Sequence, residues 1–139
     1  EWSVNIEIKD LRSTFGHERV VAAVLQMVEA SGMRDRVLLS SFNHDYLEEA
    51  KRLSPAVRTG VLVGEPIVNP LELLGRLRAD AYHPRVSAID LADVALFHEH
   101  GYRVNIWVAN EPASMEQLIR AGADGIFTDY PQVLHQLLA

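Results

Sequence analysis

Short runs of β-favouring residues alternate with longer segments of helical periodicity along the whole chain. This alternation is typical of βα units, in which helices join the parallel strands of one sheet. After a longer first gap the runs recur every ~20 to 23 residues, which leaves room for one helix and two short loops. We therefore expect about six βα units, with strands at residues 4–8, 37–42, 59–63, 79–83, 103–109 and 125–129.

Several helices have recognisable start and stop signals. The segment 20–28 places Val21, Val24, Leu25 and Val28 on one helical face, and Gly32 follows as a C-terminal cap. Four later helices are expected to begin at a polar N-capping residue, in three cases followed closely by proline. The expected caps are Asn69, Asp90, Asn110 and Asp129, and the prolines are Pro70, Pro112 and Pro131.

Composition excludes several classes of protein. The net charge of -6 argues against a general nucleic-acid or anionic-membrane surface, because neither attracts an acidic protein at long range. The chain has no cysteine, so disulfides and thiolate metal sites are excluded. No run of eighteen apolar residues predicts a membrane span. We expect one domain fragment over residues 1–139, located in the cytoplasm.

The stretch VNIEIKD, residues 4–10, alternates apolar and polar side chains. In a (β/α) barrel, alternate side chains of a strand face the helices or the interior, and catalytic groups lie at the C-terminal strand ends. Val4, Ile6 and Ile8 suit the helix side, so Asn5 and the charged pair Glu7 and Lys9 would face inward. An isolated inward charge is costly. A bound metal, an anionic ligand or pairing of the two charges, as on a solvated edge strand, would compensate.

The C-terminal third contains a specific combination of motifs. The stretch GYRVNIWVAN is followed by AGADGIFTDYP, which together resemble the closing segment of the glycerophosphodiester phosphodiesterase family. The matching residues are Trp107, Asn110, Gly122, Asp124, Gly125, Thr128, Asp129 and Pro131. NIEIK at residues 5–9 matches the family's metal-binding glutamate strand, SSFN at 40–43 its next strand end, and DAYHP at 80–84 a later one.

The resemblance implies an incomplete TIM-type barrel that comprises strands 3 to 8. It also implies hydrolysis of glycerophosphodiesters to glycerol 3-phosphate and an alcohol, assisted by a divalent cation such as Mg²⁺ or Ca²⁺. Glu7 would be a metal ligand and Lys9 a catalytic cation, while Phe42, His83 and Trp107 would contact the substrate. Two departures affect substrate contacts: His83 stands where the family usually has Asn, and Val108 where it has Thr.

The family's opening His-Arg-Gly motif, its Glu-x-Asp pair and its second catalytic histidine have no counterpart here. His44 and Asp45 follow the wrong strand to supply them. A complete barrel needs about 250 residues, whereas this chain has 139, so two βα units are expected to be missing. We expect another polypeptide segment, or an edge-to-edge second copy, to supply them. In the chain alone, the cation would bind weakly or not at all, and the chain would be inactive.

Two other functions stay open: a non-catalytic half-barrel that serves assembly or binding, and another kind of phosphate-binding barrel. Asp129 is expected to cap a helix rather than bind metal. His98 and His100 would face different ways on their helix, so a metal pair there is not expected. His17 and His135 are expected on the solvated surface.

Overall fold

A computed structural model describes residues 3–139. Its centre is a six-stranded sheet in the order β1-β2-β3-β4-β5-β6, and every neighbouring pair is parallel. The strands are β1 (Val4–Glu7), β2 (Val37–Ser41), β3 (Arg58–Val63), β4 (Ala81–Pro84), β5 (Arg103–Ile106) and β6 (Gly125–Ile126). Each expected strand is therefore present, although most are shorter than the sequence pattern indicated.

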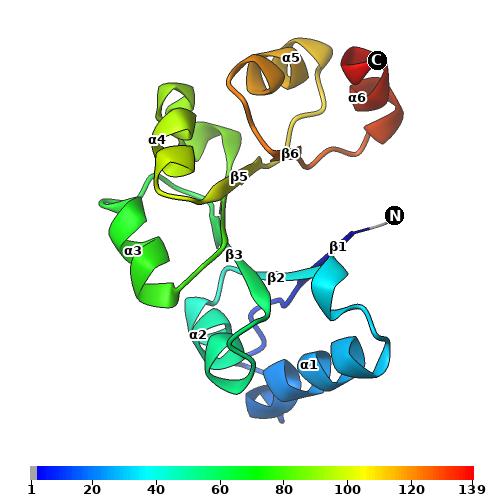
Figure 1. Cartoon of the computed structure of the whole chain (residues 1–139), viewed down its shortest axis with the longest axis vertical. Helices are drawn as coiled ribbons and strands as arrows, with labels where there is room; N and C mark the ends of the chain where they lie inside the picture. The colour runs from blue at the N-terminus through cyan, green and yellow to red at the C-terminus, as the bar shows by residue number, and fades with distance from the viewer. Residues whose placement is uncertain (1–2) are drawn as a thin grey trace.

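The sheet curls into an open arc with helices on its outer, convex side (Figure 1). The helices are α1 (Val20–Ala30), α2 (His44–Leu53), α3 (Pro70–Leu77), α4 (Val94–Glu99), α5 (Pro112–Arg120) and α6 (Pro131–Leu138). Short 3₁₀ turns occupy His17–Arg19, Arg34–Arg36, Val86–Ala88 and Leu91–Asp93. Because β1 and β6 are the two ends of the strand order, each has one edge without a partner strand among the described residues. The expected incomplete (β/α) barrel is confirmed.

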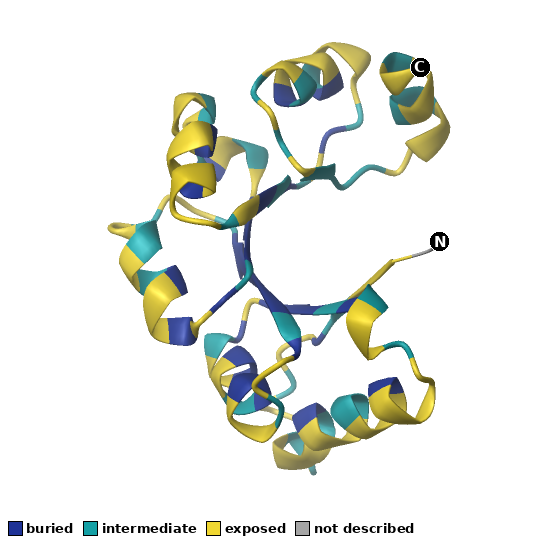
Figure 2. Cartoon of the chain, viewed as in Figure 1, coloured by how far each residue is buried: buried dark blue, intermediate teal, exposed yellow. Residues whose placement is uncertain are grey.

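The apolar core lies between the sheet and its helices, as Figure 2 shows by the dark strands and the dark inner helix faces. Ile8 and Leu39 pack with Val21 and Val28 of α1, and this cluster covers the β1–β2 end of the sheet. A larger cluster covers the rest of the sheet and includes Val61, Leu74, Phe97, Val104, Met115 and Leu118. Burial of this outer face fixes which strand residues are left to point into the interior of the arc.

The later helices are present where they were expected, but most of the expected N-capping residues do not cap them. Asp90 does cap, since its carboxylate accepts a hydrogen bond from the amide of Ala92. Asn69 stands at the N-terminus of α3 but its side chain makes no capping bond. The caps expected at Asn110 and Asp129 are wrong, because α5 and α6 begin after Glu111 and Tyr130. Instead, the side chains of Asn110 and Asp129 bind each other.

Helix α2 is the helix that the expected βα unit requires between the second and third strands, although no start or stop signal was assigned to it in the sequence. It begins at His44 and is capped by Asn43, whose side-chain oxygen accepts a hydrogen bond from the amide of Asp45. The helix is rich in charge but buries Tyr46, Leu47 and Ala50 at helical spacing. No helix in the described part of the chain is long and apolar enough to cross a membrane.

Candidate functional site

Strand β1 presents the charged pair expected from the sequence. Ile6 and Ile8 pack against the helix-side core, and Asn5 lines the interior. Glu7 ends the strand, and its Oε1 lies 2.7 Å from Nζ of Lys9. The Lys9 side chain is 72% exposed and that of Glu7 29%. The two charges therefore pair on an edge strand, which is one of the arrangements left open above, while both groups stay accessible at the C-terminal strand end.

Two aromatic rings stand at the same edge of the sheet. Phe42 follows β2 and Trp107 follows β5, and their ring centroids are 5.5 Å apart in an edge-to-face arrangement. The indole nitrogen of Trp107 donates a hydrogen bond of 2.8 Å to the backbone oxygen of His83. The peptide bond from Trp107 to Val108 is cis. The structure thus joins two of the predicted substrate-binding residues, Phe42 and Trp107, into one aromatic wall.

His83 lies deeper than this wall and is 1% exposed. The amide nitrogen of Asn105 lies 2.9 Å from His83 Nε2, and in the assigned orientation it donates to that ring nitrogen. Burial lowers the pKa of His83 to about 4, so the ring is neutral at pH 7. The ring occupies the space above Gly60, where a Cβ atom would lie 2.5 Å from Nε2. Because glycine has no side chain, position 60 leaves the space that the imidazole ring occupies.

Two buried polar atoms on the interior face have no hydrogen-bond partner among residues 3–139. They are Nδ1 of His83 and Oγ of Ser40. Ser40 is in register with Gly60 on the neighbouring strand, so both atoms flank the same glycine. Because an unsatisfied buried polar group costs about 1–3 kcal/mol, such groups commonly mark functional sites.

Side chains also tie neighbouring strand ends together. The Asn110 amide donates to Asp129 Oδ2 at 2.8 Å, while its oxygen accepts from the hydroxyl of Thr128 and the backbone nitrogen of Asp129. On the other side of the arc, Asn43 donates to the carboxylate of Asp10, and Arg12 holds the pKa of that carboxyl at about 2. These contacts fix the loops that carry the candidate site.

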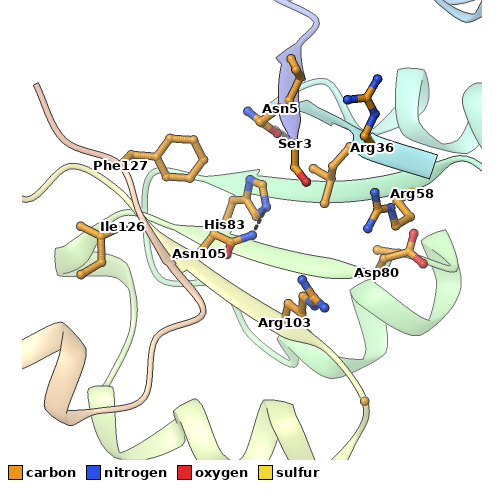
Figure 3. Close-up of a pocket in the computed structure, with 15 residues that line it drawn as sticks. Ser3, Asn5, Arg36, Arg58, Asp80, His83, Arg103, Asn105, Ile126 and Phe127 are labelled. Carbon is orange, nitrogen blue, oxygen red and sulfur yellow. Dashed lines mark hydrogen bonds between the residues drawn. The ribbon is translucent and has the colours of Figure 1, made fainter. Parts of the chain in front are cut away.

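The interior also has a hollow of about 520 Å³ toward the N-terminal strand ends. Figure 3 shows its lining, with His83 and Asn105 at the centre, Phe127 above them and Arg58 and Arg103 at the rim. Glu7, Lys9 and the aromatic wall do not line it. Of the residues expected to contact the substrate, His83 lines this hollow, whereas Phe42 and Trp107 do not.

The expected divalent cation fits the residues of this chain only in part. Nowhere in residues 3–139 do three or more His, Asp or Glu side chains come together as a possible metal site. Glu7 is a single carboxylate, and Asp129 is held by Asn110. One carboxylate is too few ligands for a hard cation, which needs several oxygen atoms.

The remaining histidines take structural roles. His98 Nε2 lies 2.8 Å from Asp124, and His100 Nδ1 lies 2.9 Å from the backbone oxygen of Leu96, so the two do not form a metal pair. His135 is exposed as expected. His17 is partly exposed, and its Nδ1 lies 3.5 Å from the hydroxyl of Tyr46.

Parallel strands, outer helices and polar side chains at the C-terminal strand ends define a barrel protein of the (β/α) type, open between β1 and β6 in the described residues. The chain belongs to the Glycerophosphoryl diester phosphodiesterase family, whose family model matches residues 1–133.

Curated relatives agree with this assignment. The chain is 34% identical to the uncharacterized protein YqiK of Bacillus subtilis, over 99% of this chain and 57% of that protein. It is 30% identical to a glycerophosphodiester phosphodiesterase of Caldanaerobacter subterraneus, over 99% of this chain and 56% of that protein. The chain therefore spans about half the length of the curated relatives it matches.

Solved structures show the same fold. A putative glycerophosphoryl diester phosphodiesterase from Silicibacter pomeroyi superposes with a TM-score of 0.88 at 28% identity, covering 98% of this chain and 50% of that one. A phosphodiesterase from Oleispira antarctica, solved in complex with the product sn-glycerol-3-phosphate, has the same score and identity, covering 98% of this chain and 55% of that one.

Sequence reasoning did not find several residues of the site. Asn105 and Ser40 are polar residues on the interior face. The available signal for Asn105 was its polar side chain two positions before Trp107, on the same face of the strand. Gly60 gave no signal, because its role depends on a side chain from the adjacent strand.

Proposed function

We propose that residues 1–139 form a fragment of a glycerophosphodiester phosphodiesterase domain, which contributes to hydrolysis of glycerophosphodiesters to glycerol 3-phosphate and an alcohol. The family match over residues 1–133 carries this proposal. The Oleispira antarctica relative, with its bound product, supports the substrate class. The grouping of Glu7, Lys9, Phe42 and Trp107 at one edge of the sheet agrees with it.

Each residue has a proposed role. Lys9 offsets the negative charge of the phosphate as a compact ammonium group. Phe42 and Trp107 form the wall against which the organic part of the substrate packs. His83 supports this wall through the hydrogen bond from Trp107 to its backbone oxygen, and the direct substrate contact expected for its ring stays a prediction.

A divalent cation, Mg²⁺ or Ca²⁺, would polarise the phosphoryl group and neutralise developing charge. Glu7 would be its ligand from this chain, and the other ligands would come from elsewhere. Within residues 3–139, β1 and β6 each have one edge without a partner strand, which favours further strands from elsewhere, because exposed strand edges pair readily. We propose that another polypeptide segment with the missing βα units completes the barrel and the ligand set.

The alternative is a half-barrel that acts only in assembly or binding. The ion pair between Glu7 and Lys9 favours it, since the pair satisfies both charges without a metal. So does the lack of a three-ligand cluster in residues 3–139.

An assay of glycerol 3-phosphate release separates the two functions. The chain is measured alone and together with the N-terminal segment of the Caldanaerobacter subterraneus enzyme, its relative at 30% identity. We expect activity only in the mixture, dependent on added Mg²⁺ or Ca²⁺ and abolished by Glu7→Gln, whereas Glu48→Gln on the exposed face of α2 should have no effect. A mixture that forms a stable complex yet stays inert favours the binding module.

A further inference from the structure

We propose that Arg85 forms an anion-recognising subsite at the aromatic wall and selects phosphodiesters whose alcohol carries a negative charge. The inference rests on the proposed function and adds to it the class of alcohol that the site accepts.

The backbone places Arg85 beside Trp107. The amide of Trp107 donates to the oxygen of Pro84, and its own oxygen accepts from the amide of Val86, so Arg85 and Trp107 are a register pair beyond the end of the sheet. The amide of Arg85 donates to the oxygen of Val63, which ties the same residue to β3. Arg85 is therefore anchored on both sides at the C-terminal strand ends.

The pair continues a ladder of contacts between β4 and β5. Ala81 is in register with Arg103, His83 is bonded to Asn105, and Arg85 is in register with Trp107. The ladder rises from the N-terminal strand ends to the C-terminal ends. Arg85 thus stands at the level of the aromatic wall, one step above the buried His83.

A hollow of about 400 Å³ opens at this position. It is lined by Arg85, Val86, Ser87, Trp107 and Val108. Val108 is 49% exposed, and Arg85 and Ser87 are exposed as well. The hollow shares no lining residue with the larger interior hollow, but it shares Trp107 with the aromatic wall, against which the organic part of the substrate is proposed to pack.

The guanidinium of Arg85 has no hydrogen-bond or ion-pair partner within residues 3–139, whereas the acidic groups of the proposed site have theirs. Glu7 is paired with Lys9, and Asp129 accepts from Asn110. An unpaired planar guanidinium binds carboxylate and phosphate groups through two parallel hydrogen bonds. The chemistry of the hollow therefore suits an anionic group that packs against the indole.

A cationic alcohol is the main competitor. The faces of Trp107 and Phe42 could attract a quaternary or primary ammonium group. However, Arg85 lines the same hollow, and its permanent positive charge repels a second cation. The sign of the charge at residue 85 therefore decides between the two kinds of alcohol.

The test uses three diesters of glycerol 3-phosphate with alcohols of similar size: glycolate, ethylene glycol and ethanolamine, which are anionic, neutral and cationic. Values of kcat/KM are measured on the completed barrel. We expect wild type to prefer the glycolate diester, and Arg85→Gln to lower the glycolate-to-ethanolamine ratio by about three- to tenfold. Arg85→Lys should restore part of the ratio. Arg76→Gln, an exposed arginine on α3, should leave it unchanged.

An unchanged ratio in Arg85→Gln overturns the proposal. An equal loss for all three diesters also overturns it, since Arg85 would then bind the shared phosphate. If the barrel hydrolyses none of the diesters, the proposed function fails, and Arg85 is judged on binding alone. Trp107 fluorescence of the Trp2→Phe chain is then titrated with the glycolate and ethylene glycol diesters. A larger loss of affinity for the glycolate diester in Arg85→Gln supports the subsite, and an equal loss for both diesters, or no loss, refutes it.

Discussion

The side chains of His83 and Asn105 meet inside the arc of the sheet, with the amide nitrogen of Asn105 at 2.9 Å from His83 Nε2. The two residues are far apart in sequence and come together because β4 and β5 are parallel neighbours. Since Nε2 accepts, the proton of the neutral ring is on Nδ1, which has no partner in the described residues. The contact thus holds a neutral imidazole in a buried position.

This burial predicts a pH-dependent stability. The pKa of His83 falls from 6.5 to about 4 on folding, so the unfolded chain binds the proton first as the pH drops. Stability from this group is complete above pH 6.5 and should decrease by about 3 kcal/mol between pH 6.5 and 4. Urea unfolding across this range measures the loss. The unfolding free energy should change less with pH in His83→Gln than in wild type. An equal pH dependence in the two proteins would show that the ring does not titrate in this way.

Asp10 contributes to stability in a lower pH range. The pKa of Asp10 is lowered from 3.8 to about 2 by Arg12, so its contribution is complete above pH 3.8 and is lost only below it. The histidine effect is therefore best read in the upper part of its range, above about pH 5, where this carboxyl stays ionised in both states.

Two Gly→Ala substitutions should have opposite effects. At Gly60 the added methyl group would lie 2.5 Å from His83 Nε2, and the ring or the backbone would have to move. We expect Gly60→Ala to destabilise the protein by about 1–3 kcal/mol, as overpacked cores do. At Gly75 in α3 the methyl group would meet only the Tyr102 hydroxyl, at 3.8 Å, among the described residues outside the helix, and alanine should stabilise the helix by about 0.5–1 kcal/mol. Thermal unfolding distinguishes them, and a loss at Gly75 would contradict the helix argument.

A third prediction concerns the ion pair between α2 and the start of β4. Lys51 Nζ lies 2.7 Å from Asp80 Oδ2, and the lysine side chain is only 7% exposed. Asp80 also accepts from the amide of Thr59. Asp80→Ala should cost about 2 kcal/mol, because it leaves a buried ammonium group without a partner, and the 41% exposure of Asp80 limits the loss.

Lys51→Met is the informative comparison for this pair. It removes the buried charge and keeps an apolar side chain of similar length, so it should cost less than Asp80→Ala. The double variant should be less destabilised than the sum of the two single variants. Chemical denaturation of the four proteins measures the coupling, and strict additivity would mean that the ion pair contributes nothing.

The fold was predictable because alternation of strands and helices is a local signal that parallel pairing turns directly into a barrel. Contacts between strands were not predictable in the same way. Asn110 and Asp129 each look like an N-cap in the sequence, and only the adjacency of β5 and β6 makes them partners. Gly60 has a role only because His83 comes from the next strand. The bounds of α2 were not predicted, because its many charged residues obscure a short buried face.

Asn110 provides the last prediction. Its amide makes three hydrogen bonds to Thr128 and Asp129, which join the loop after β5 to the loop before α6. Asn110→Ala should therefore cost about 1–3 kcal/mol and speed amide hydrogen exchange at Asp129 N, whose acceptor is lost. Gln117→Ala on the exposed face of α5 is the control and should change neither quantity. Unchanged protection at Asp129 in the Asn110 variant would mean that the backbone of β6, rather than this side chain, holds the end of the arc.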